Sequence, residues 1–599
     1  MYRAPVDEIV HTLKNVTGLG SQIEAGEAGD LSEDLLAAIV EEGARFAGDE
    51  IAPLSRAGDE QGAHVKDGVV SLPDGWADLY RNWAEGGWNA LSGPEGFGGQ
   101  GLPMSLQIAA FEMWNSGSLA FAIGPTLTIG AIEAIDAHAS DELKAIYLEK
   151  LVSGEWTGTM NLTEPQAGSD LNALKSRAEP VGDGSYRVFG QKIYITYGEH
   201  EMTDNIVHLV LARLPDAPAG QRGVSLFLVP KVLEDGTRND VYCHSVEHKL
   251  GIHASPTCTM LYGDGKFGDE PGAIGWLIGE ENRGLACMFT MMNNARIMVA
   301  IQGTAVAEAA TQKALAYAQE RRQGKAEGFD GEGMAPIIHH PDVQRNIATM
   351  RALTNASRTI AYNCAHAIAR ADELNHASAR NGGEPTPEMP FWQNRAALLT
   401  PVAKAFATDI GCEVASIGVQ VHGGMGFVEE TGAAQLLRDA RIAPIYEGTN
   451  GIQAIDLVTR KLPLDGGEHV RGYIGELRDM IEEVRGSNRA DLNGVADALS
   501  EGLDDLLAAT EWLLDRMAAG EKSSALSGAT PYLRLFALAS GSTYLAASAV
   551  RSEDADIAER AAIARFAALD ILTTTSSLRR SIEGGSAALL AAGQFLKSA

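Results

Sequence analysis

A block of strand-like sequence interrupts a chain whose pattern is otherwise typical of helices. Segments 34–47 and 106–114 carry apolar residues three and four positions apart, which is the spacing of an amphipathic helix. Between about 157 and 276, short runs rich in Val, Ile, Leu and aromatic residues alternate with turn formers, as in QKIYIT, HLVLARL and VSLFLV. Helical spacing returns from about 280. The pattern predicts an α+β multidomain protein with helices at 1–156, a β domain at 157–276, a helical bundle at 277–462 and a further helical domain at 463–599.

The charge balance excludes several classes of partner. The 599 residues include 48 Lys and Arg against 79 Asp and Glu, a formal net charge of −31. Such a surface repels polyanions, so we expect binding neither to nucleic acid nor to an acidic membrane surface. The sequence has no run of eighteen apolar residues, so we also expect no stable insertion into a membrane. The five cysteines include no pair with CxxC spacing, which disfavours disulfides and zinc. The first twenty residues resemble neither a signal peptide nor a transit peptide, so the expected location is cytoplasmic.

One glycine motif is a weak signal. Gly96, Gly98 and Gly101 match the GxGxxG fingerprint of dinucleotide-binding folds. That motif functions between a strand and a helix, and here Ser92-Gly93-Pro94-Glu95 precedes it in place of an apolar strand. We therefore expect an ordinary glycine-rich loop.

Two motifs in the strand-like block could meet a ligand. The segment NLTEPQAGSD contains Thr163 and Ser169 among small residues, which suits contact with an anionic or heteroaromatic group, although a turn with capping residues has the same composition. Tyr194-Ile195-Thr196-Tyr197-Gly198 places an aromatic ring and a hydroxyl at a strand end, where a plain strand edge is the alternative.

Two motifs in the second helical block carry chemistry. Gly423 and Gly424, after Gln420, end a long helix either as a C-cap or as backbone close to a phosphate. Glu447 lies in the apolar loop segment IYEGTN, where its charged form would be disfavoured and its carboxylate could serve as a base; a surface turn is the alternative. The long helix before these motifs carries Asn293 and Arg296. At its far end lie Arg321, Arg322 and Lys325, which either complement the helix dipole or bind a phosphate.

Taken together, these motifs resemble the acyl-CoA dehydrogenase family over most of residues 30–462. The matching segments are NLTEPQAGSD, KIYITYG, KLGIHASPTC, AQERRQGK, QVHGGMGF and RDARIAPIYEGTNGIQ. The added C-terminal block and the opening MYRAPVDEI resemble a longer bacterial subgroup, which includes an enzyme of dimethylsulfoniopropionate demethylation. The resemblance implies a β-barrel-like middle domain, bound FAD, and removal of hydrogen from Cα and Cβ of an acyl-CoA thioester.

The resemblance also implies roles for individual residues. Glu447 matches the catalytic base that takes the α-proton. Residues that match FAD contacts are Leu162, Thr163, Ser169, Tyr194, Thr196, Arg321, Gln420, Gly423, Gly424 and Thr449. Residues that match substrate contacts are Ser169, Asn293, Arg296, Tyr446 and Gly448. The chain departs from the family pattern at Tyr194, where Trp is usual, at Tyr197, where Asn is usual, and at 321–324, which is one residue short and lacks Phe.

The expected substrate is a short- or medium-chain acyl-CoA, with 3-methylmercaptopropionyl-CoA as the leading case and long-chain fatty acyl-CoA as the alternative. In 3-methylmercaptopropionyl-CoA, a sulfur atom replaces one methylene of a linear acyl chain. A difference of one methylene changes the relative preference of an enzyme for two substrates by only about 1–3 kcal/mol. The expected electron acceptor is electron-transferring flavoprotein. Because FAD is expected to bridge subunits and the added block could cover a tetramer surface, a homodimer is expected.

Three other functions are compatible with the motifs. An acyl-CoA oxidase would use the same base with oxygen as acceptor. A DNA-associated flavoprotein should have a basic C-terminal region, yet residues 471–599 hold 13 Lys and Arg against 18 Asp and Glu. A scaffold without activity would tolerate loss of Glu447. For the anionic cofactors, the predicted local cations are Arg345, Arg351, Arg358 and Arg370 together with Arg296, Arg321, Arg322 and Lys325.

Overall fold

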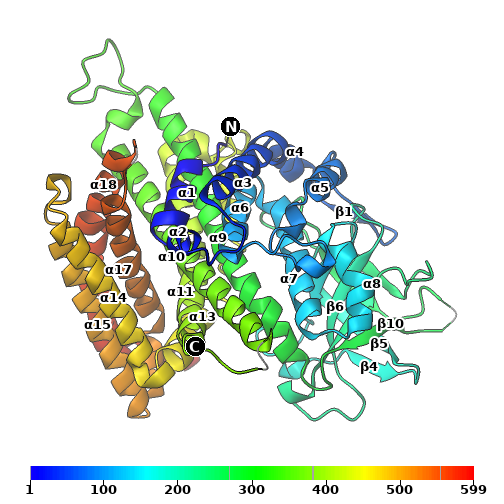
Figure 1. Ribbon diagram of the computed structural model, residues 1–599. Helices are drawn as coiled ribbons and strands as arrows, with labels where there is room; N and C mark the ends of the chain where they lie inside the picture. Colours follow the sequence, from blue (N-terminus) through cyan, green and yellow to red (C-terminus); the bar gives the residue numbers. More distant parts are fainter. Residues whose placement is uncertain (1, 269, 381–382, 554, 599) are drawn as a thin grey trace. The chain divides into compact units, whose positions relative to one another are not determined.

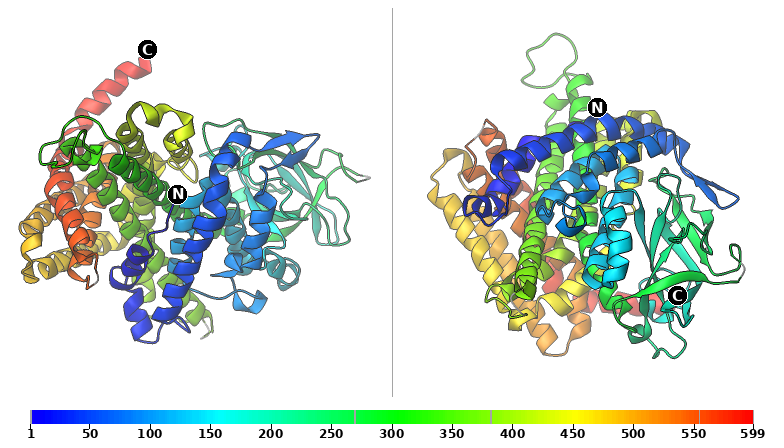
Figure 2. Two further views of the ribbon diagram at one scale, coloured as in Figure 1. Left: turned by 90° about the horizontal axis from the view of Figure 1, so that it is seen from above. Right: turned by 45° about the vertical axis from the view of Figure 1, so that its right-hand side comes forward.

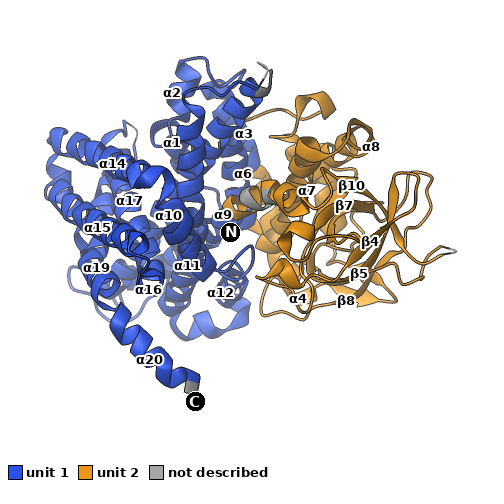
Figure 3. Ribbon diagram, turned by 90° about the horizontal axis from the view of Figure 1, so that it is seen from below, with its two compact units in different colours: residues 1–44, 103–116, 299–599 blue, residues 45–102, 117–298 orange. Residues whose placement is uncertain are grey.

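The computed structural model describes residues 2–268, 270–380, 383–553 and 555–598. These residues form two compact units (Figure 3): unit 1 contains 1–44, 103–116 and 299–599, and unit 2 contains 45–102 and 117–298. The long helix α9 (Gly284–Glu320) begins in unit 2 and continues into unit 1 from Val299. The boundaries of the four domains expected from the sequence stay a prediction.

Unit 2 is built around a mixed sheet of eight strands, in the order β3-β6-β7-β10-β5-β9-β8, with β4 paired to β5 (Figure 1). Only the β3–β6 pair is parallel among the strands described. The bounds are β3 (Thr157–Asn161), β4 (Arg177–Pro180), β5 (Ser185–Thr196), β6 (Ile206–Ala212), β7 (Ser225–Pro230), β8 (Val241–Val246), β9 (Thr257–Tyr262) and β10 (Ala273–Ile278). The three strand-like runs of the sequence lie in β5, β6 and β7.

Strands β6 and β7 are buried on both faces, which explains why they are almost wholly apolar. Side chains alternate between the faces of a strand. Leu209 and Leu211 of β6 pack in the cluster that contains α7 (Leu119–His138) and α8 (Asp141–Val152). Val210 and Ala212 pack in a second cluster with β8 and β9. Every residue of β6 is buried as a result.

The remaining part of unit 2 precedes α7. It contains α4 (Ala52–Gln61), the short hairpin of β1 (His64–Lys66) and β2 (Val69–Ser71), and α5 (Trp76–Glu85). The GxGxxG segment follows and forms a single 3₁₀ turn, Glu95–Phe97, with no strand before it. The expectation of an ordinary glycine-rich loop is therefore confirmed.

Unit 1 is helical. Its N-terminal and central helices are α1 (Val6–Asn15), α2 (Leu19–Glu24), α3 (Glu33–Phe46), α6 (Met104–Gly117), the second part of α9, α10 (Pro341–Arg380), α11 (Met389–His422), α12 (Ala433–Ala440) and α13 (Asn450–Asp456). The C-terminal helices are α14 (Glu468–Gly486), α15 (Val495–Ala518), α16 (Lys522–Ser527), α17 (Ala529–Val550), α18 (Ile557–Phe566), α19 (Thr575–Gly584) and α20 (Ser586–Ser598). Helix α17 packs against α10, α14, α15, α18 and α19, whereas α20 extends away from the bundle (Figure 2).

The main chains of α9 and α11 lie in contact where the two helices cross, because glycines face each other there. A Cβ atom on Gly303 would lie 2.2 Å from the Ala407 carbonyl oxygen, and one on Gly411 would lie 2.8 Å from the Gly303 carbonyl oxygen. Only the absence of a side chain permits this approach. The crossing fixes α11, and with it the loop after α12, against the middle of α9.

A buried ion network joins α6, α9 and α10. Arg358 has no exposed surface and donates to Glu112 Oε1 from Nε and Nη2 (2.8 and 2.6 Å) and to Glu308 Oε2 (2.8 Å). Arg351 donates to both oxygens of Glu308 (3.0 and 2.9 Å), and the Tyr362 hydroxyl donates to Glu112. Buried charges are tolerated when they are paired in this way.

Within the described part of the chain, two helices, α7 and α17, are long and apolar enough to cross a membrane by length and composition. In each, 89% of the most apolar window is buried inside the protein, as is usual for a core helix. All five cysteines are free thiols, as expected from their spacing.

Gly303→Ala should destabilise the protein, because the added methyl group would overlap helix backbone, not a movable side chain. Overpacking of this kind costs about 1–3 kcal/mol. The matched control is Gly472→Ala in α14, where a Cβ would meet nothing within 4 Å and where alanine favours the helix. Thermal unfolding followed by circular dichroism should show a lower Tm for the first variant and an equal or higher Tm for the second. Equal Tm values for Gly303→Ala and the wild type would contradict the close crossing.

Candidate active site

The loop after β3 is held from inside unit 2 by a buried ion pair. Lys192 of β5 and Glu164 are 0% and 3% exposed, and their charged atoms lie 2.9 Å apart. Lys192 Nζ also donates to the Leu162 carbonyl oxygen (3.1 Å), while the Thr163 carbonyl oxygen accepts from the Ile193 backbone N–H (2.9 Å). The segment Leu162–Glu164 is therefore fixed to β5 through its main chain.

Glu164 also organises the second half of the loop. Its carboxylate accepts hydrogen bonds from the backbone N–H groups of Lys175 (2.7 Å) and Ser176 (3.0 Å). Burial alone would raise the pKa of Glu164, but the Lys192 ammonium and these hydrogen bonds lower it to about 2. Burial lowers the pKa of Lys192 to about 8, against the raising effect of Glu164.

The end of β5 has an irregular backbone. The pairing of β5 with β9 shifts register between Lys192 and Ile195, and Tyr194 at this bulge has φ +59° and is 61% exposed. Tyr197 has φ +50°, yet its ring is buried; its hydroxyl donates to the Ala120 carbonyl oxygen (2.7 Å) and accepts from Trp76 Nε1 (3.1 Å). Left-handed backbone in large side chains is uncommon and concentrates at functional sites.

Three hydroxyl groups of this region remain available to a ligand. The side-chain oxygens of Thr163, Ser169 and Thr196 take part in no hydrogen bond with the residues described, and Ser169 is exposed. The main chain of Thr196 is fixed because its carbonyl oxygen accepts from Thr159 Oγ1 (2.8 Å). Rigid backbone with free hydroxyl groups is the donor and acceptor set expected of a site for a polar heteroaromatic ring.

Glu447 lies in the loop between α12 and α13 of unit 1, as expected. It is half-buried, with φ +54°, and Gly448 follows with φ +84°. Gln453 Nε2 donates to the carbonyl oxygens of Glu447 (3.3 Å) and Gly448 (3.4 Å). The loop backbone is thus held in a conformation that a glutamate rarely adopts.

A buried lysine also holds the main chain of the loop that carries Glu447. Lys404 of α11 has no exposed surface and donates to the carbonyl oxygens of Ala443 (3.0 Å) and Gly448 (2.9 Å) and to Asn450 Oδ1 (3.0 Å). Asn450 Nδ2 in turn donates to Ala405 O, Thr408 Oγ1 and Asp409 Oδ1. The Thr449 side chain caps α13 by accepting from the Ile452 N–H. The carboxylate of Glu447 is therefore carried on a fixed main chain.

Tyr446 connects this loop to α9. Its hydroxyl donates to Gln302 Oε1. Burial is the main cause that raises the pKa of Tyr446, and the negative charge of Glu447 raises it further. The phenol is therefore a neutral hydrogen-bond donor at physiological pH.

Arg321 and the Gln420–Gly424 segment lie at neighbouring helix ends. Tyr317, whose carbonyl oxygen accepts from the Arg321 N–H (2.8 Å), stacks on His422 with ring centroids 4.4 Å apart. Gln420 is exposed, and a Cβ on Gly423 or Gly424 would meet nothing within 4 Å, so the main chain there is open to a ligand. Arg321 is exposed and makes no ion pair with the residues described.

The predicted cations of α10 are not available to cofactors. Arg358 and Arg351 pair with Glu112 and Glu308, Arg345 pairs with Asp570, and Arg370 pairs with Glu27 and Glu373. That expectation is wrong because the arginines neutralise carboxylates of the same unit. Arg296 is half-buried in α9, whereas the side chain of Asn293 is outside the described part of the chain.

Sequence reasoning missed the residues that hold both loops, namely Lys192, Glu164, Lys404, Asn450 and Gln453. A charged residue inside an apolar run, such as Lys192 in QKIYIT or Lys404 in PVAKAF, was the available signal. The partners could not be inferred because they lie 28 to 46 residues away along the chain.

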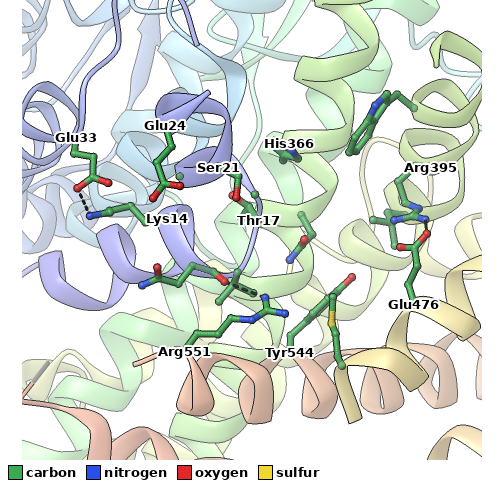
Figure 4. Close-up of a pocket in the computed structure, with 18 residues that line it drawn as sticks. Lys14, Thr17, Ser21, Glu24, Glu33, His366, Arg395, Glu476, Tyr544 and Arg551 are labelled. Atoms are coloured by element: carbon green, nitrogen blue, oxygen red, sulfur yellow. Dashed lines mark hydrogen bonds and ion pairs between the residues drawn. The ribbon is translucent and has the colours of Figure 1, made fainter. Parts of the chain in front are cut away.

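A cavity of unit 1 lies away from these loops. It has a volume of about 540 Å³ and is lined by the α1–α2 turn and by α10, α11, α14 and α17 (Figure 4). Its cations are committed, since Arg395 Nη2 donates to Glu476 (2.6 Å) and Arg551 pairs with Glu483 (2.6 Å). It contains none of the predicted site residues. Among the described residues, no group of three His, Cys, Asp or Glu side chains could hold a metal ion.

Comparison with known proteins shows the family of this chain. Four family models match in succession: the acyl-CoA dehydrogenase N-terminal domain at 34–155, its middle domain at 159–264, its C-terminal domain at 282–462, and the acetyl-CoA dehydrogenase C-terminal-like domain at 473–592. The chain belongs to the acyl-CoA dehydrogenase family, whose members are FAD-dependent oxidoreductases. The fold expected from the sequence is confirmed.

Among relatives, the chain is 45% identical over 547 residues to 3-methylmercaptopropionyl-CoA dehydrogenase of Ruegeria pomeroyi, which covers 89% of this chain and 88% of the relative. It is 36% identical to a butyryl-CoA dehydrogenase of Syntrophomonas wolfei, covering 72% and 71%. Among solved structures, an acyl-CoA dehydrogenase of Bacillus anthracis complexed with FAD has a TM-score of 0.72 at 21% identity, covering 92% of this chain and 88% of that one.

The Lys192–Glu164 pair should make stability depend on pH. The folded-state pKa of Glu164, about 2, lies below its ordinary value of 4.5, so its contribution is complete above about pH 4.5 and is lost as the pH falls toward 2. In Glu164→Gln, the midpoint of urea unfolding should fall less steeply between pH 4.5 and 2.5 than in the wild type. Glu155→Gln, which alters an exposed pair with Lys150, is the control. Parallel curves for Glu164→Gln and the wild type would refute the linkage.

Proposed function

We propose that this enzyme oxidises 3-methylmercaptopropionyl-CoA, or another short- or medium-chain acyl-CoA, to the trans-2-enoyl-CoA. The observation that carries the proposal is a carboxylate, Glu447, on a loop whose main chain is fixed by Lys404 and Gln453. The 45% identity to 3-methylmercaptopropionyl-CoA dehydrogenase and the 36% identity to butyryl-CoA dehydrogenase support acyl groups of this size.

Glu447 is the proposed catalytic base. An α-proton of a thioester is weakly acidic, so the base must be positioned against Cα and the developing oxyanion must be stabilised. The Glu447 carboxylate takes the α-proton, and the backbone N–H of the same residue donates to the thioester oxygen. A preorganised donor of this kind contributes about 3–4 kcal/mol in other enzymes. Because the main chain is already clamped, little reorganisation is needed as charge develops.

The residues present fit FAD. Bound FAD supplies the acceptor for the hydride that leaves Cβ. In unit 2, the main chain of Leu162, the free hydroxyls of Thr163, Ser169 and Thr196, and the exposed ring of Tyr194 are proposed to hold the isoalloxazine side. In unit 1, Arg321, with Gln420, Gly423, Gly424 and Thr449, is proposed to hold the pyrophosphate and adenine side.

The CoA thioester is proposed to contact Ser169, Asn293, Arg296, Tyr446 and Gly448. Arg296 supplies a cation for a CoA phosphate. Tyr446 and Gly448 flank the base, so they lie where the reacting end of the thioester must be.

The electron acceptor and the assembly are also proposals. A solved structure named for the electron-transferring flavoprotein of Acidaminococcus fermentans is 28% identical to this chain, covering 72% of this chain and 98% of that one, at a TM-score of 0.55. Electron-transferring flavoprotein is the proposed acceptor in place of oxygen.

We propose a cytoplasmic homodimer in which Arg321 and the Gln420–Gly424 segment bind FAD of the neighbouring subunit. Light scattering should give twice the chain mass, and a tetramer would contradict this arrangement.

Glu447→Gln should abolish turnover while FAD stays bound, since only the side chain that takes the proton is altered. Loss of a general base lowers the rate by about 10²–10⁴-fold. Turnover of butanoyl-CoA and 3-methylmercaptopropionyl-CoA with a dye acceptor measures activity, and flavin absorbance after gel filtration measures retention of FAD. The exposed Glu430 supplies the control variant Glu430→Gln. Activity in Glu447→Gln within threefold of the wild type would remove Glu447 from the mechanism and leave a base elsewhere.

A further inference from the structure

The side chain of Gln302 is an unsatisfied polar group in the interior of unit 1. It has no exposed surface. Its Oε1 accepts the hydrogen bond from the Tyr446 hydroxyl, but its Nε2 has no hydrogen-bond partner among the described residues. Leaving a buried N–H group unpaired destabilises the folded protein, and such groups are rare in folded proteins. Gln302 therefore requires an explanation that its protein neighbours do not supply.

The position of Gln302 indicates where that explanation lies. Tyr446 directly precedes Glu447, and the Glu447 charge is close enough to contribute to the raised pKa of Tyr446. Gln302 also directly precedes Gly303, at the crossing that fixes α9 against α11, and α11 carries the lysine that clamps the base loop. The carboxamide is thus held, through Tyr446, beside the group proposed to take the α-proton. An acyl chain whose Cα reaches Glu447 must run through the same neighbourhood.

The free group is a donor, and this limits the acyl groups that it favours. A methylene cannot accept a hydrogen bond, so an all-carbon chain leaves Nε2–H unpaired in the complex as well. A thioether sulfur is a weak acceptor and a polarisable atom, and it occupies nearly the volume of a methylene. Pairing a buried donor that is otherwise unsatisfied improves binding only for the chain that contains the acceptor.

We propose that Gln302 is a specificity-determining residue, whose carboxamide Nε2–H selects an acyl-CoA with a thioether sulfur in the chain over the all-carbon chain of the same length. This inference rests on the proposed function, because it assumes that the acyl group lies against Glu447. Tyr446 acts as a positioning residue, since its hydrogen bond to Oε1 turns Nε2 of the amide away from the phenol.

The experiment compares 3-methylmercaptopropionyl-CoA with pentanoyl-CoA, in which a methylene replaces the sulfur, on the FAD-loaded enzyme with a dye acceptor. The ratio of the two kcat/KM values should favour the thioether in the wild type. In Gln302→Leu the ratio should fall about 3- to 10-fold, the range that corresponds to one net hydrogen bond. The fall should come from the thioether substrate, with pentanoyl-CoA turned over as well as before or better.

Matched variants separate this role from a structural one. Gln312→Leu changes a glutamine of the same helix that bonds to Arg3 and Glu308, and it should leave the ratio unchanged. Tyr446→Phe keeps the ring but releases the amide, so it should lower the ratio by less than Gln302→Leu does. If Gln302→Leu yields no folded flavoprotein, judged by flavin absorbance and Tm, Gln302→Met preserves the length of the side chain and serves the same comparison.

An unchanged ratio in both Gln302 variants would overturn the proposal. An equal loss of both substrates, with the ratio preserved, would also overturn it, because a residue that only supports the fold would give that result. Neither outcome affects the proposed function, which fails only if the wild type oxidises neither thioester.

Discussion

The crossing of α9 and α11 at Gly303 is the constraint from which the geometry around the candidate base follows. Two backbones can approach this closely only where neither carries a side chain, and Gly303 and Gly411 meet that condition on facing helices. Helix α11 also carries the buried Lys404, which donates to carbonyl oxygens of the loop that contains Glu447. Helix α9 carries Gln302, whose amide oxygen accepts from the Tyr446 hydroxyl. The surroundings of the candidate base Glu447 thus depend on residues of α9 and α11, the two helices that cross at Gly303.

Electrostatics divides the arginines of this acidic protein into two groups. Those of α10 neutralise buried or partly buried carboxylates, as the Arg358 bonds to Glu112 and Glu308 show most fully. Burial raises the pKa of Glu112, against the lowering effect of Arg358. Burial also acts to raise the pKa of Glu308, but Arg351 and Arg358 lower it to about 2. Arg321 is different, because it extends from the end of α9 and forms no ion pair with the described residues. A net charge of −31 therefore gives little information about any one site.

Much of the fold could be predicted because its pattern is local. The runs in β5, β6 and β7 and the long uninterrupted segment of α9 show their type within a few residues, and Glu447 was found because an apolar loop with a single carboxylate is unusual. The supports could not be predicted in the same way. Lys192 and Lys404 each occur as one charged residue in an apolar stretch, and nothing local indicates that the first binds the Leu162 carbonyl or the second that of Gly448. Gln302 resembles any helical glutamine until its missing partner becomes visible.

The backbone at Tyr197 clarifies one departure of this chain from its family. Asparagine, which is usual there, enters the left-handed region more easily than most residues, and Tyr197 has φ +50°. A tyrosine accepts the conformational strain because its ring gains two hydrogen bonds, to Trp76 and to the Ala120 carbonyl oxygen. Tyrosine at this position therefore links the end of β5 to α5 and α7 through hydrogen bonds.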